Sequence, residues 1–161
     1  MGVSGCGKST VGELLAKRLG VEFIEGDQYH PVENVAKMAA GEPLTDADRH
    51  GWLMTLAEKL AYARGTKKSV VLSCSALKES YRDILRQGAS DVWFVYLSGS
   101  FEVLNARVIA RNHQYMPPSL LHSQLATLEP PKAAARVLEY DITKSPAEIV
   151  DLVQVQLLSQ A

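Results

Sequence analysis

The stretch G-V-S-G-C-G-K-S at residues 2–9 decides the fold, because it satisfies the pattern G-x-x-x-x-G-K-[ST] at every fixed position. Gly2, Gly5 and Gly7 let the backbone turn tightly, so that successive N–H groups point inward and form a nest for phosphate oxygens. A glycine-rich helix entry without a ligand would not require lysine followed by serine at this offset. The pattern therefore predicts a P-loop that binds a nucleotide.

The loop and the helix that follows it are expected to contact ATP and its metal ion. Lys8 is expected to reach the β- and γ-phosphates as a catalytic cation, and Ser9 to offer its hydroxyl to Mg²⁺. The helix that begins here adds the positive end of its dipole. Cys6 occupies a variable position, where a small tolerated side chain explains it without a redox role. The expected nucleotide contacts of the loop are Gly2, Val3, Ser4, Gly5, Cys6, Gly7, Lys8, Ser9 and Thr10.

The composition indicates one domain with no general affinity for nucleic acids or membranes. The chain has 161 residues, 47% of them hydrophobic, which is enough for one core and predicts a single domain over residues 1–161. Its 17 Lys and Arg against 18 Asp and Glu leave a net charge of -1, so any phosphate binding is local. No apolar run approaches the roughly 20 residues that span a bilayer, and Cys6 and Cys74 lack zinc-site spacing. A cytoplasmic protein is expected.

Short apolar runs alternate with stretches of helical spacing along the chain. Apolar, β-branched or aromatic residues predict strands at 21–24, 69–74, 92–97 and, more weakly, 137–142. Helical spacing occurs at 11–19, 52–60 and 149–157. Continuously apolar strands separated by helices favour a parallel sheet covered on both faces, because each parallel pair needs a crossover. The expected fold is a three-layer α/β/α sandwich of the P-loop kinase type.

The segment 111–131 interrupts this alternation. It holds four of the seven prolines, and the pairs at 117–118 and 130–131 bracket a helical pattern of leucines. Proline is tolerated in the first turn of a helix and just beyond its end, so a short inserted helix is predicted. Such an insert over the P-loop would act as a lid.

The rest of the sequence narrows the class of P-loop protein. A GTPase would need an N/T-K-x-D element, but the segment 143–146 reads T-K-S-P, with proline where the aspartate belongs. The runs ending at Leu72 and Leu97 carry no aspartate for the Mg²⁺ shell. Asp27 instead follows the run 21–24, at the edge where open parallel sheets bind their ligands. An aspartate there can accept the proton of an attacking hydroxyl, which predicts a catalytic role for Asp27.

Beyond the P-loop, the chain resembles the gluconate kinases in nearly its whole length. The matching segments are G-D-Q-Y-H-P at 26–31, Asn34, K-M at 37–38, G-x-P-L-x-D-x-D-R at 41–49, W-L at 52–53, C-S-A-L-K at 74–78, Y-R-D at 81–83, L-R at 85–86, L-L at 120–121, S-Q at 123–124 and L-E-P-P at 128–131. The resemblance implies transfer of phosphate from ATP to the 6-hydroxyl of D-gluconate, on the fold of the shikimate and nucleoside monophosphate kinases. It also suggests a homodimer.

The resemblance also implies residues for the acceptor and for the transferring phosphate. Asp27 would activate the substrate hydroxyl, and Arg49 and Arg82 would bind the sugar acid's carboxylate and hydroxyls. An arginine fork suits a carboxylate. Lys78, Tyr81 and Arg82 share a helix face by their i, i+3, i+4 spacing, so Lys78 is expected to contact the substrate as well. The alternative for each charged residue is a solvated surface charge. His30 is a secondary substrate contact, with packing or helix capping as its alternative.

Two arginines are expected beside the phosphates, as in the lids of related kinases. Arg107 and Arg111 lie i, i+4 on the helix that leads into the insert, where Arg107 would contact the nucleotide and Arg111 would stabilise charge on the γ-phosphate. The segment 112–117 departs from the G-H-F/Y-M-P pattern of the family, which leaves a role for His113 open.

Two further expectations complete the sequence-based interpretation. A P-loop normally follows a buried strand, and here only Met1 precedes it. The central first strand is therefore expected to be missing, and roughly six to twelve upstream residues are expected to belong to the working protein.

The alternatives to a gluconate kinase are another small-metabolite kinase of the shikimate type and an ATP-binding module without turnover.

Overall fold

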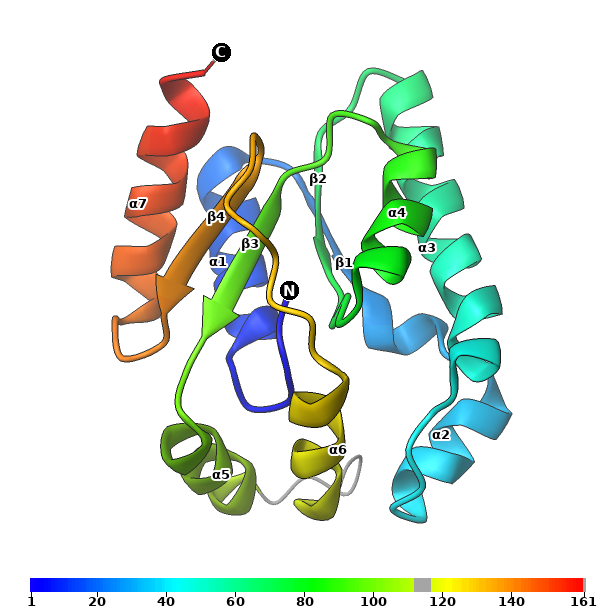
Figure 1. Ribbon diagram of the computed structural model, residues 1–161. Coiled ribbons are helices and arrows are strands. Elements are labelled where there is room, and N and C mark those ends of the chain that lie inside the picture. Colours follow the sequence, from blue (N-terminus) through cyan, green and yellow to red (C-terminus); the bar gives the residue numbers. More distant parts are fainter. Residues whose placement is uncertain (112–116, 161) are drawn as a thin grey trace.

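The computed structural model describes residues 1–111 and 117–160. Strands and helices alternate as expected, and all four predicted strands are confirmed with shifts of one or two residues at their ends (Figure 1). In chain order the elements are α1 (Lys8–Leu19), β1 (Glu22–Glu25), the short 3-10 helix η1 (Gly26–Tyr29), α2 (Val32–Ala39), α3 (Asp46–Gly65), β2 (Val70–Ser73), α4 (Glu79–Gly88), β3 (Phe94–Ser98), α5 (Phe101–Ala110), α6 (Ser119–Thr127), β4 (Val137–Asp141) and α7 (Pro146–Leu158).

The strands form two parallel pairs. β1 pairs with β2, with Glu22 opposite Val70, and β3 pairs with β4, with Phe94 opposite Val137. Each pair is connected through a helix, as parallel strands require. Because the strands are parallel, their carboxyl ends point to the same end of the molecule, where the P-loop, α5 and α6 lie (Figure 1).

A gap separates the two pairs at the centre of the molecule. Within the described residues no ladder joins β2 to β3. Met1 lies at this gap and bonds to β3 on both sides of its own backbone: its amino group donates to the Val95 carbonyl oxygen at 2.6 Å, and its carbonyl oxygen accepts from the Leu97 amide at 3.0 Å. Gly2 then donates to the Ser75 carbonyl oxygen. The strand expected before the P-loop is therefore represented here by Met1 alone.

The gap is an apolar space, called the central groove below. Its volume is about 370 Å³, and facing side chains of strands and helices form its walls. Its apolar lining includes Met1, Val11, Leu15, Leu60, Val70, Leu72, Phe94, Val95, Leu97, Val153 and Leu157.

Helices flank the strands on two sides. α1 packs against β1, β2 and α7, while α3 packs along α4 (Figure 1). α3 buries Trp52, Leu53 and Leu56 in the core, and its first turn is fixed by a capping box between Thr45 and Asp48. These helices hold the loops at the carboxyl ends of the strands in place, which is where the candidate site forms.

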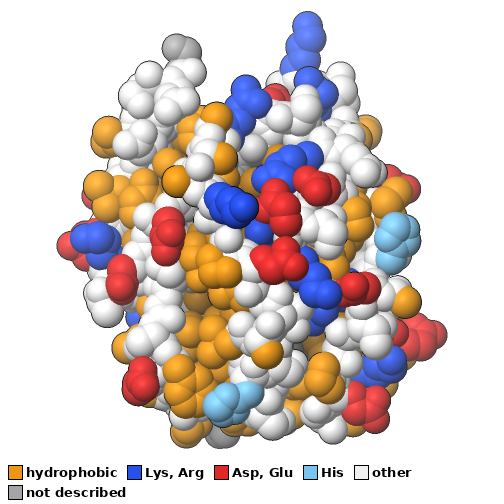
Figure 2. Space-filling view, in the orientation of Figure 1, with side chains coloured by type: hydrophobic (Ala, Val, Ile, Leu, Met, Phe, Trp, Pro, Cys, Tyr) orange, Lys and Arg blue, Asp and Glu red, His pale blue; other side chains and the backbone are white. Residues whose placement is uncertain are grey.

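The surface carries both signs of charge. In the view of Figure 2, acidic and basic side chains lie close together near the centre of the face. On α4, Arg86 pairs with both Glu79 and Asp83. Among the described residues, none of the helices has the length and apolar character needed to cross a bilayer.

Candidate active site

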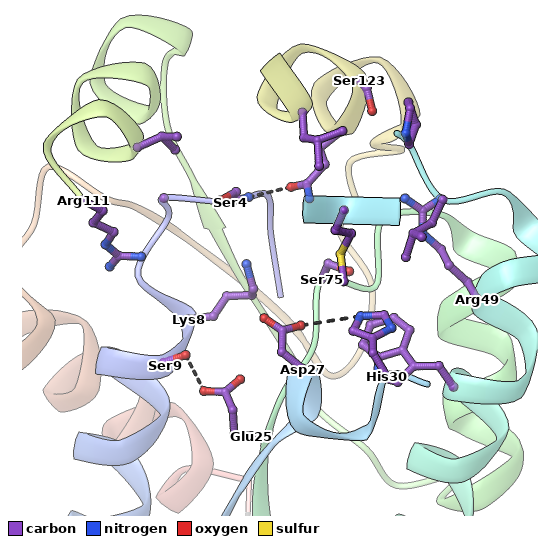
Figure 3. A pocket seen from close by; sticks show the side chains of 18 of the residues that line it. Ser4, Lys8, Ser9, Glu25, Asp27, His30, Arg49, Ser75, Arg111 and Ser123 are labelled. Carbon is purple, nitrogen blue, oxygen red and sulfur yellow. Dashed lines mark hydrogen bonds and ion pairs between the residues drawn. The ribbon is translucent and has the colours of Figure 1, made fainter. Parts of the chain in front are cut away.

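A cavity of about 340 Å³ opens at the carboxyl ends of the strands, between the P-loop, η1, α3 and α6 (Figure 3). Lys8 and Arg111 approach it from one side, and His30 and Arg49 from the other. The lining residues are Ser4, Gly5, Gly7, Lys8, Ser9, Glu25, Asp27, Gln28, His30, Met38, Pro43, Leu44, Arg49, Trp52, Ser75, Val108, Arg111, Leu120, Ser123 and Gln124.

The P-loop takes the tight conformation that its glycines predict. Gly5 has φ +83°, and a Cβ on it would lie 2.9 Å from Cγ2 of Val108 and 3.0 Å from the carbonyl oxygen of Leu104, so the loop packs directly on α5. Lys8 Nζ donates to the Val3 carbonyl oxygen at 3.0 Å, which folds the lysine over its own loop. The loop is thereby shaped, and its lysine placed, before any phosphate binds.

The sequence analysis missed Glu25, the last residue of β1. The Ser9 hydroxyl donates to Glu25 Oε2 at 2.5 Å, and the Ser73 hydroxyl donates to the other carboxylate oxygen. Ser73 also accepts from the Gly26 amide, so the ends of β1 and β2 are linked. The position of Glu25 in the sequence could have indicated this role, because Glu25 ends the strand that leads to Asp27 and precedes Asp27 by two residues.

Asp27 stands in η1, and its carboxylate opens to the cavity. Its side chain is 51% exposed, yet burial within the cleft, followed by the negative charge of Glu25, raises the pKa of this carboxyl, while Lys8 lowers it. His30 Nε2 lies 3.8 Å from Asp27 Oδ1 (Figure 3). Asp27 thus lines the same cavity as Lys8, and its catalytic role stays a prediction.

His30 is a neutral neighbour of this carboxylate. Its ring stacks on Trp52 with centroids 3.9 Å apart, and burial together with the charge of Arg49 lowers the pKa of His30 to about 4. Asn34 Nδ2 lies 3.3 Å from the other ring nitrogen. The ring is thus held in place by packing, and it also faces the cavity.

Arg49 is a buried cation on the wall of the cavity. It is 7% exposed, and its Nη1 donates to the Tyr81 hydroxyl at 3.1 Å. Within residues 1–111 and 117–160 it forms no ion pair with a carboxylate. A buried charge without a counterion is costly, so this arrangement suits an anion that arrives with the ligand.

The helices α5 and α6 close the cavity on the side of the P-loop. The backbone amide of Ser4 donates to Gln124 Oε1 of α6 at 2.7 Å, so the inserted helix touches the loop directly (Figure 3). Arg111 lines the cavity from the end of α5. Arg107 is directed to the Ile142 carbonyl oxygen at 2.7 Å, with its Nη1 4.0 Å from the point where a Cβ on Gly7 would lie.

Lys78 and Arg82 do not reach the cavity, in contrast to the expectation that both bind substrate. Arg82 is 1% exposed, and all its donor nitrogens are engaged, with the carbonyl oxygens of Ala76, Leu77 and Glu129 and with the Glu79 carboxylate. It fastens the chain after β2 to the chain after α6. Lys78 pairs with Asp46 at 2.9 Å near the surface. Helical spacing put these two side chains near one another but could not say which way the helix faces.

Four of the expected loop contacts lie outside the cavity lining. Within the loop, Gly2, Val3 and Cys6 are buried, and Thr10 is exposed on α1. Backbone groups of buried residues can still face a ligand, so these positions stay predictions. His113 and the rest of the segment 112–116 lie outside the described residues.

The sequence and structure of the chain resemble those of known kinases of small molecules. The family model described as Shikimate kinase matches residues 4–151. A probable gluconokinase of Mus musculus is 46% identical over 166 residues, which cover 92% of this chain and 90% of the relative.

Two solved structures share both fold and sequence. A gluconokinase from Sinorhizobium meliloti is 46% identical with a TM-score of 0.85, covering 100% of this chain and 94% of the other. An unliganded sugar kinase from Janibacter sp. HTCC2649 is 42% identical with a TM-score of 0.92, covering 98% and 91%. Both likenesses extend over the P-loop, the end of β1 and the inserted helix. By this extent of identity, the chain belongs to the gluconokinase family, on the fold of the shikimate kinases.

Proposed function

We propose that this protein transfers the γ-phosphate of ATP to the 6-hydroxyl of D-gluconate, giving 6-phospho-D-gluconate and ADP. The observation that carries the proposal is a single cavity that joins the P-loop lysine Lys8, the carboxylate of Asp27 and the buried cation Arg49. Each of these groups suits one part of the reaction. Lys8 suits the phosphates, Asp27 the proton of the attacking hydroxyl, and Arg49 the acid group of the acceptor. The family membership supports the same activity.

On the nucleotide side, the P-loop would hold the phosphates through its backbone amides and Lys8. A hydroxyl and a carboxylate, Ser9 and Glu25, meet beside it, and such oxygen ligands suit Mg²⁺. Within the described residues no cluster of three His, Cys, Asp or Glu could hold a metal without help. These two residues would therefore hold the ion jointly with the phosphates. When bound, Mg²⁺ neutralises charge that develops on the phosphate oxygens.

On the acceptor side, Asp27 would accept the proton of the attacking hydroxyl. Burial raises the pKa of Asp27 above the usual range of an aspartate, which makes its ionised carboxylate a stronger base toward that proton. The neutral ring of His30 beside it adds no competing charge. Its stacking on Trp52 makes it a wall of the acceptor pocket.

Arg49 would bind the carboxylate of gluconate, an anion to pair with a buried cation that forms no ion pair among the described residues. Arg111, at the opposite side of the cavity, would approach the transferring phosphate, where a cation stabilises the developing charge. Arg107 is not among the lining residues, because its guanidinium donates to the Ile142 carbonyl oxygen, but it lies near Gly7, so its contact with the nucleotide stays a prediction. Arg49 and Arg111 would therefore lie at opposite ends of the acceptor, with its acid group at Arg49 and its reacting hydroxyl on the side of Arg111.

Location and assembly extend this proposal. Cys6 and Cys74 are both free and buried, and burial raises the pKa of the Cys74 thiol to about 12, which suits a reducing cytoplasm where ATP is available. A homodimer, implied by the family resemblance, is a prediction for a size measurement in solution.

The test is consumption of ATP with a panel of acceptors. With gluconate we expect ATP use and a phosphate ester at the terminal carbon, identified by phosphorus NMR. A clear preference for shikimate or a nucleoside monophosphate would reverse the assignment of substrate. ATP binding without consumption in the presence of any acceptor would instead favour a module without turnover.

A further inference from the structure

Arg49 is held in place by residues that do not touch the cavity. Its guanidinium carbon lies 5.5 Å from the centre of the Tyr81 ring, and its Nη1 donates to the Tyr81 hydroxyl at 3.1 Å. Tyr81 is 3% exposed, stands in the first turn of α4 and is absent from the cavity lining. Any effect of Tyr81 on a ligand in the cavity must therefore pass through Arg49.

The Tyr81 hydroxyl has a fixed direction. It donates its hydrogen to Asp46 Oδ1 while its oxygen accepts from Arg49. Asp46, in the first turn of α3, also accepts from Lys78 Nζ at 2.9 Å. Burial raises the pKa of Tyr81, so its hydroxyl stays protonated and can donate. Hydrogen bonds from Tyr81 and Lys78 lower the pKa of Asp46, so its carboxylate stays charged and can accept. The chain Asp46–Tyr81–Arg49 thus crosses from α3 to α4 and back.

Such a chain matters because a free arginine side chain has many rotamers. A guanidinium binds a carboxylate best when its planar fork already faces the site, since ordering it on binding reduces affinity. Among the described residues, the Tyr81 hydroxyl is the only hydrogen-bond partner of the Arg49 guanidinium.

We propose that Tyr81, fixed by Asp46, is the positioning residue for Arg49 and thereby sets the affinity for the carboxylate of the sugar acid. This inference rests on the proposed function, in which Arg49 binds that carboxylate. It assigns Tyr81 no contact with substrate or nucleotide. It therefore predicts an effect on the acid acceptor that is separate from ATP binding and from the chemical step.

The first experiment compares Tyr81→Phe with the wild type in steady-state kinetics. The substitution keeps the ring and its packing but removes the hydroxyl. We expect the KM for gluconate to rise about tenfold, the size expected for one hydrogen bond to a charged group, with kcat and the KM for ATP changed less than about twofold. Tyr96→Phe is the matched control, because Tyr96 is also a buried tyrosine, 7% exposed, and lies outside the cavity. It should change none of these constants.

The second experiment tests whether Tyr81 acts through Arg49. In an Arg49→Ala background, Tyr81→Phe should change kcat/KM for gluconate by less than about twofold, because no guanidinium remains to be positioned. If the two substitutions instead multiply, Tyr81 acts independently of Arg49 and the inference is overturned.

Asp46→Ala gives a variant with less risk to the fold, because Asp46 is exposed. It should raise the KM for gluconate about threefold and leave the KM for ATP unchanged, since the Tyr81 hydroxyl then loses its fixed acceptor. If Tyr81→Phe and Asp46→Ala both lower kcat and raise the KM for ATP as much as the KM for gluconate, the two residues have a general structural role and the inference is overturned. If the wild type itself consumes no ATP with gluconate, the proposed function fails first; a wild type that is active beside an unaffected Tyr81→Phe overturns only the positioning role.

Discussion

The active-site cavity and the central groove are hollows of similar volume, about 340 and 370 Å³, but they are lined by different chemistry. The cavity brings together charged groups from separate elements, Lys8, Asp27 and Arg49, and apolar side chains such as Leu44 and Trp52 complete its wall. The groove is walled mainly by apolar side chains from the strand pairs and from α1 and α7. The first is suited to a charged ligand, and the second to a strand of main chain with apolar side chains.

This difference separates the residues that govern turnover from those that govern stability. The charged and polar side chains of the cavity are oriented by hydrogen bonds, such as Ser9 to Glu25 and Arg49 to Tyr81, whereas Trp52 and Val108 of its wall belong to the main apolar core. The two strand pairs, in contrast, are joined across the groove through the bonds of Met1 and Gly2. Substitutions in the cavity should therefore change kinetics at constant stability, and changes to the groove should do the reverse.

Lys8→Ala is expected to have the largest effect, because Lys8 brings the P-loop's positive charge to the phosphates. We expect phosphoryl transfer to fall by about 10³-fold or more, the range found for cations that stabilise the transferring phosphate. The melting temperature should change little, since Lys8 is half-buried and its side chain, within the described part of the chain, bonds to Val3 and Cys6 of its own loop. Lys68→Ala, at an exposed lysine beside the groove, is the control. Turnover near that of the wild type in Lys8→Ala would remove this lysine from the mechanism.

Asp27→Asn should have the next largest effect. The amide can still form hydrogen bonds but cannot take a proton, so kcat should fall by about 10² to 10⁴, the range for loss of a general base. The KM for ATP should change less than about twofold. The matched control is Asp83→Asn, at an exposed residue of α4 that lies outside the cavity. An effect confined to the KM for ATP would assign Asp27 to nucleotide binding instead.

The contrast between cavity and groove also explains what the sequence could predict. Local rules were sufficient for the P-loop, because its glycines and the Lys8–Ser9 pair act within eight residues of one another. They were sufficient as well for Asp27, which the end of a strand places at the ligand-binding edge. The four strands were predictable from apolar runs alone.

Contacts between distant segments were beyond such rules. Arg82 was assigned to substrate, although it links Ala76, directly after β2, to Glu129, which follows Arg82 by 47 residues in the sequence. Glu25 was missed because its role depends on Ser9 and Ser73. Tyr81 could be given no partner from the sequence, because its bond to Arg49 needs the packing of α3 on α4. In each case the side chain's partner is set by tertiary packing, which spacing along one helix or strand does not contain.

The pH dependence of activity should show a smaller effect of the same cavity. Asp27 must be ionised to accept a proton, so kcat/KM for gluconate should fall about tenfold per pH unit below its pKa. Burial and the charge of Glu25 raise this pKa, so the acidic limb should lie above the usual range of an aspartate. An acidic limb that is unchanged in Asp27→Asn would show that another group titrates.

The smallest effect on activity, and the clearest effect on stability, is expected from filling the central groove. A variant extended before Met1 by about five apolar, β-branched residues should place a parallel strand between β2 and β3, because Met1 already bonds to β3. An unpaired buried backbone group costs about 1–3 kcal/mol, whereas ordering each added residue costs about 1–2 kcal/mol. The net gain is therefore a few kcal/mol, or roughly 5–10 °C in melting temperature for a chain of this size.

The measurement compares three proteins by thermal unfolding and by gluconate-dependent ATP use: the chain of 161 residues, the apolar extension and an extension of equal length made of glycine and serine. Glycine and serine add chain without apolar side chains, and glycine weakens a strand, so this control should not raise the melting temperature. The activity of all three should agree within about twofold well below the melting temperature, because the cavity's polar groups are held by their own bonds. Equal melting temperatures for the apolar and the glycine–serine variants would show that the groove does not accept a strand. A large gain in turnover from the apolar extension would show instead that the cavity depends on the groove, and the separation of the two regions would fail.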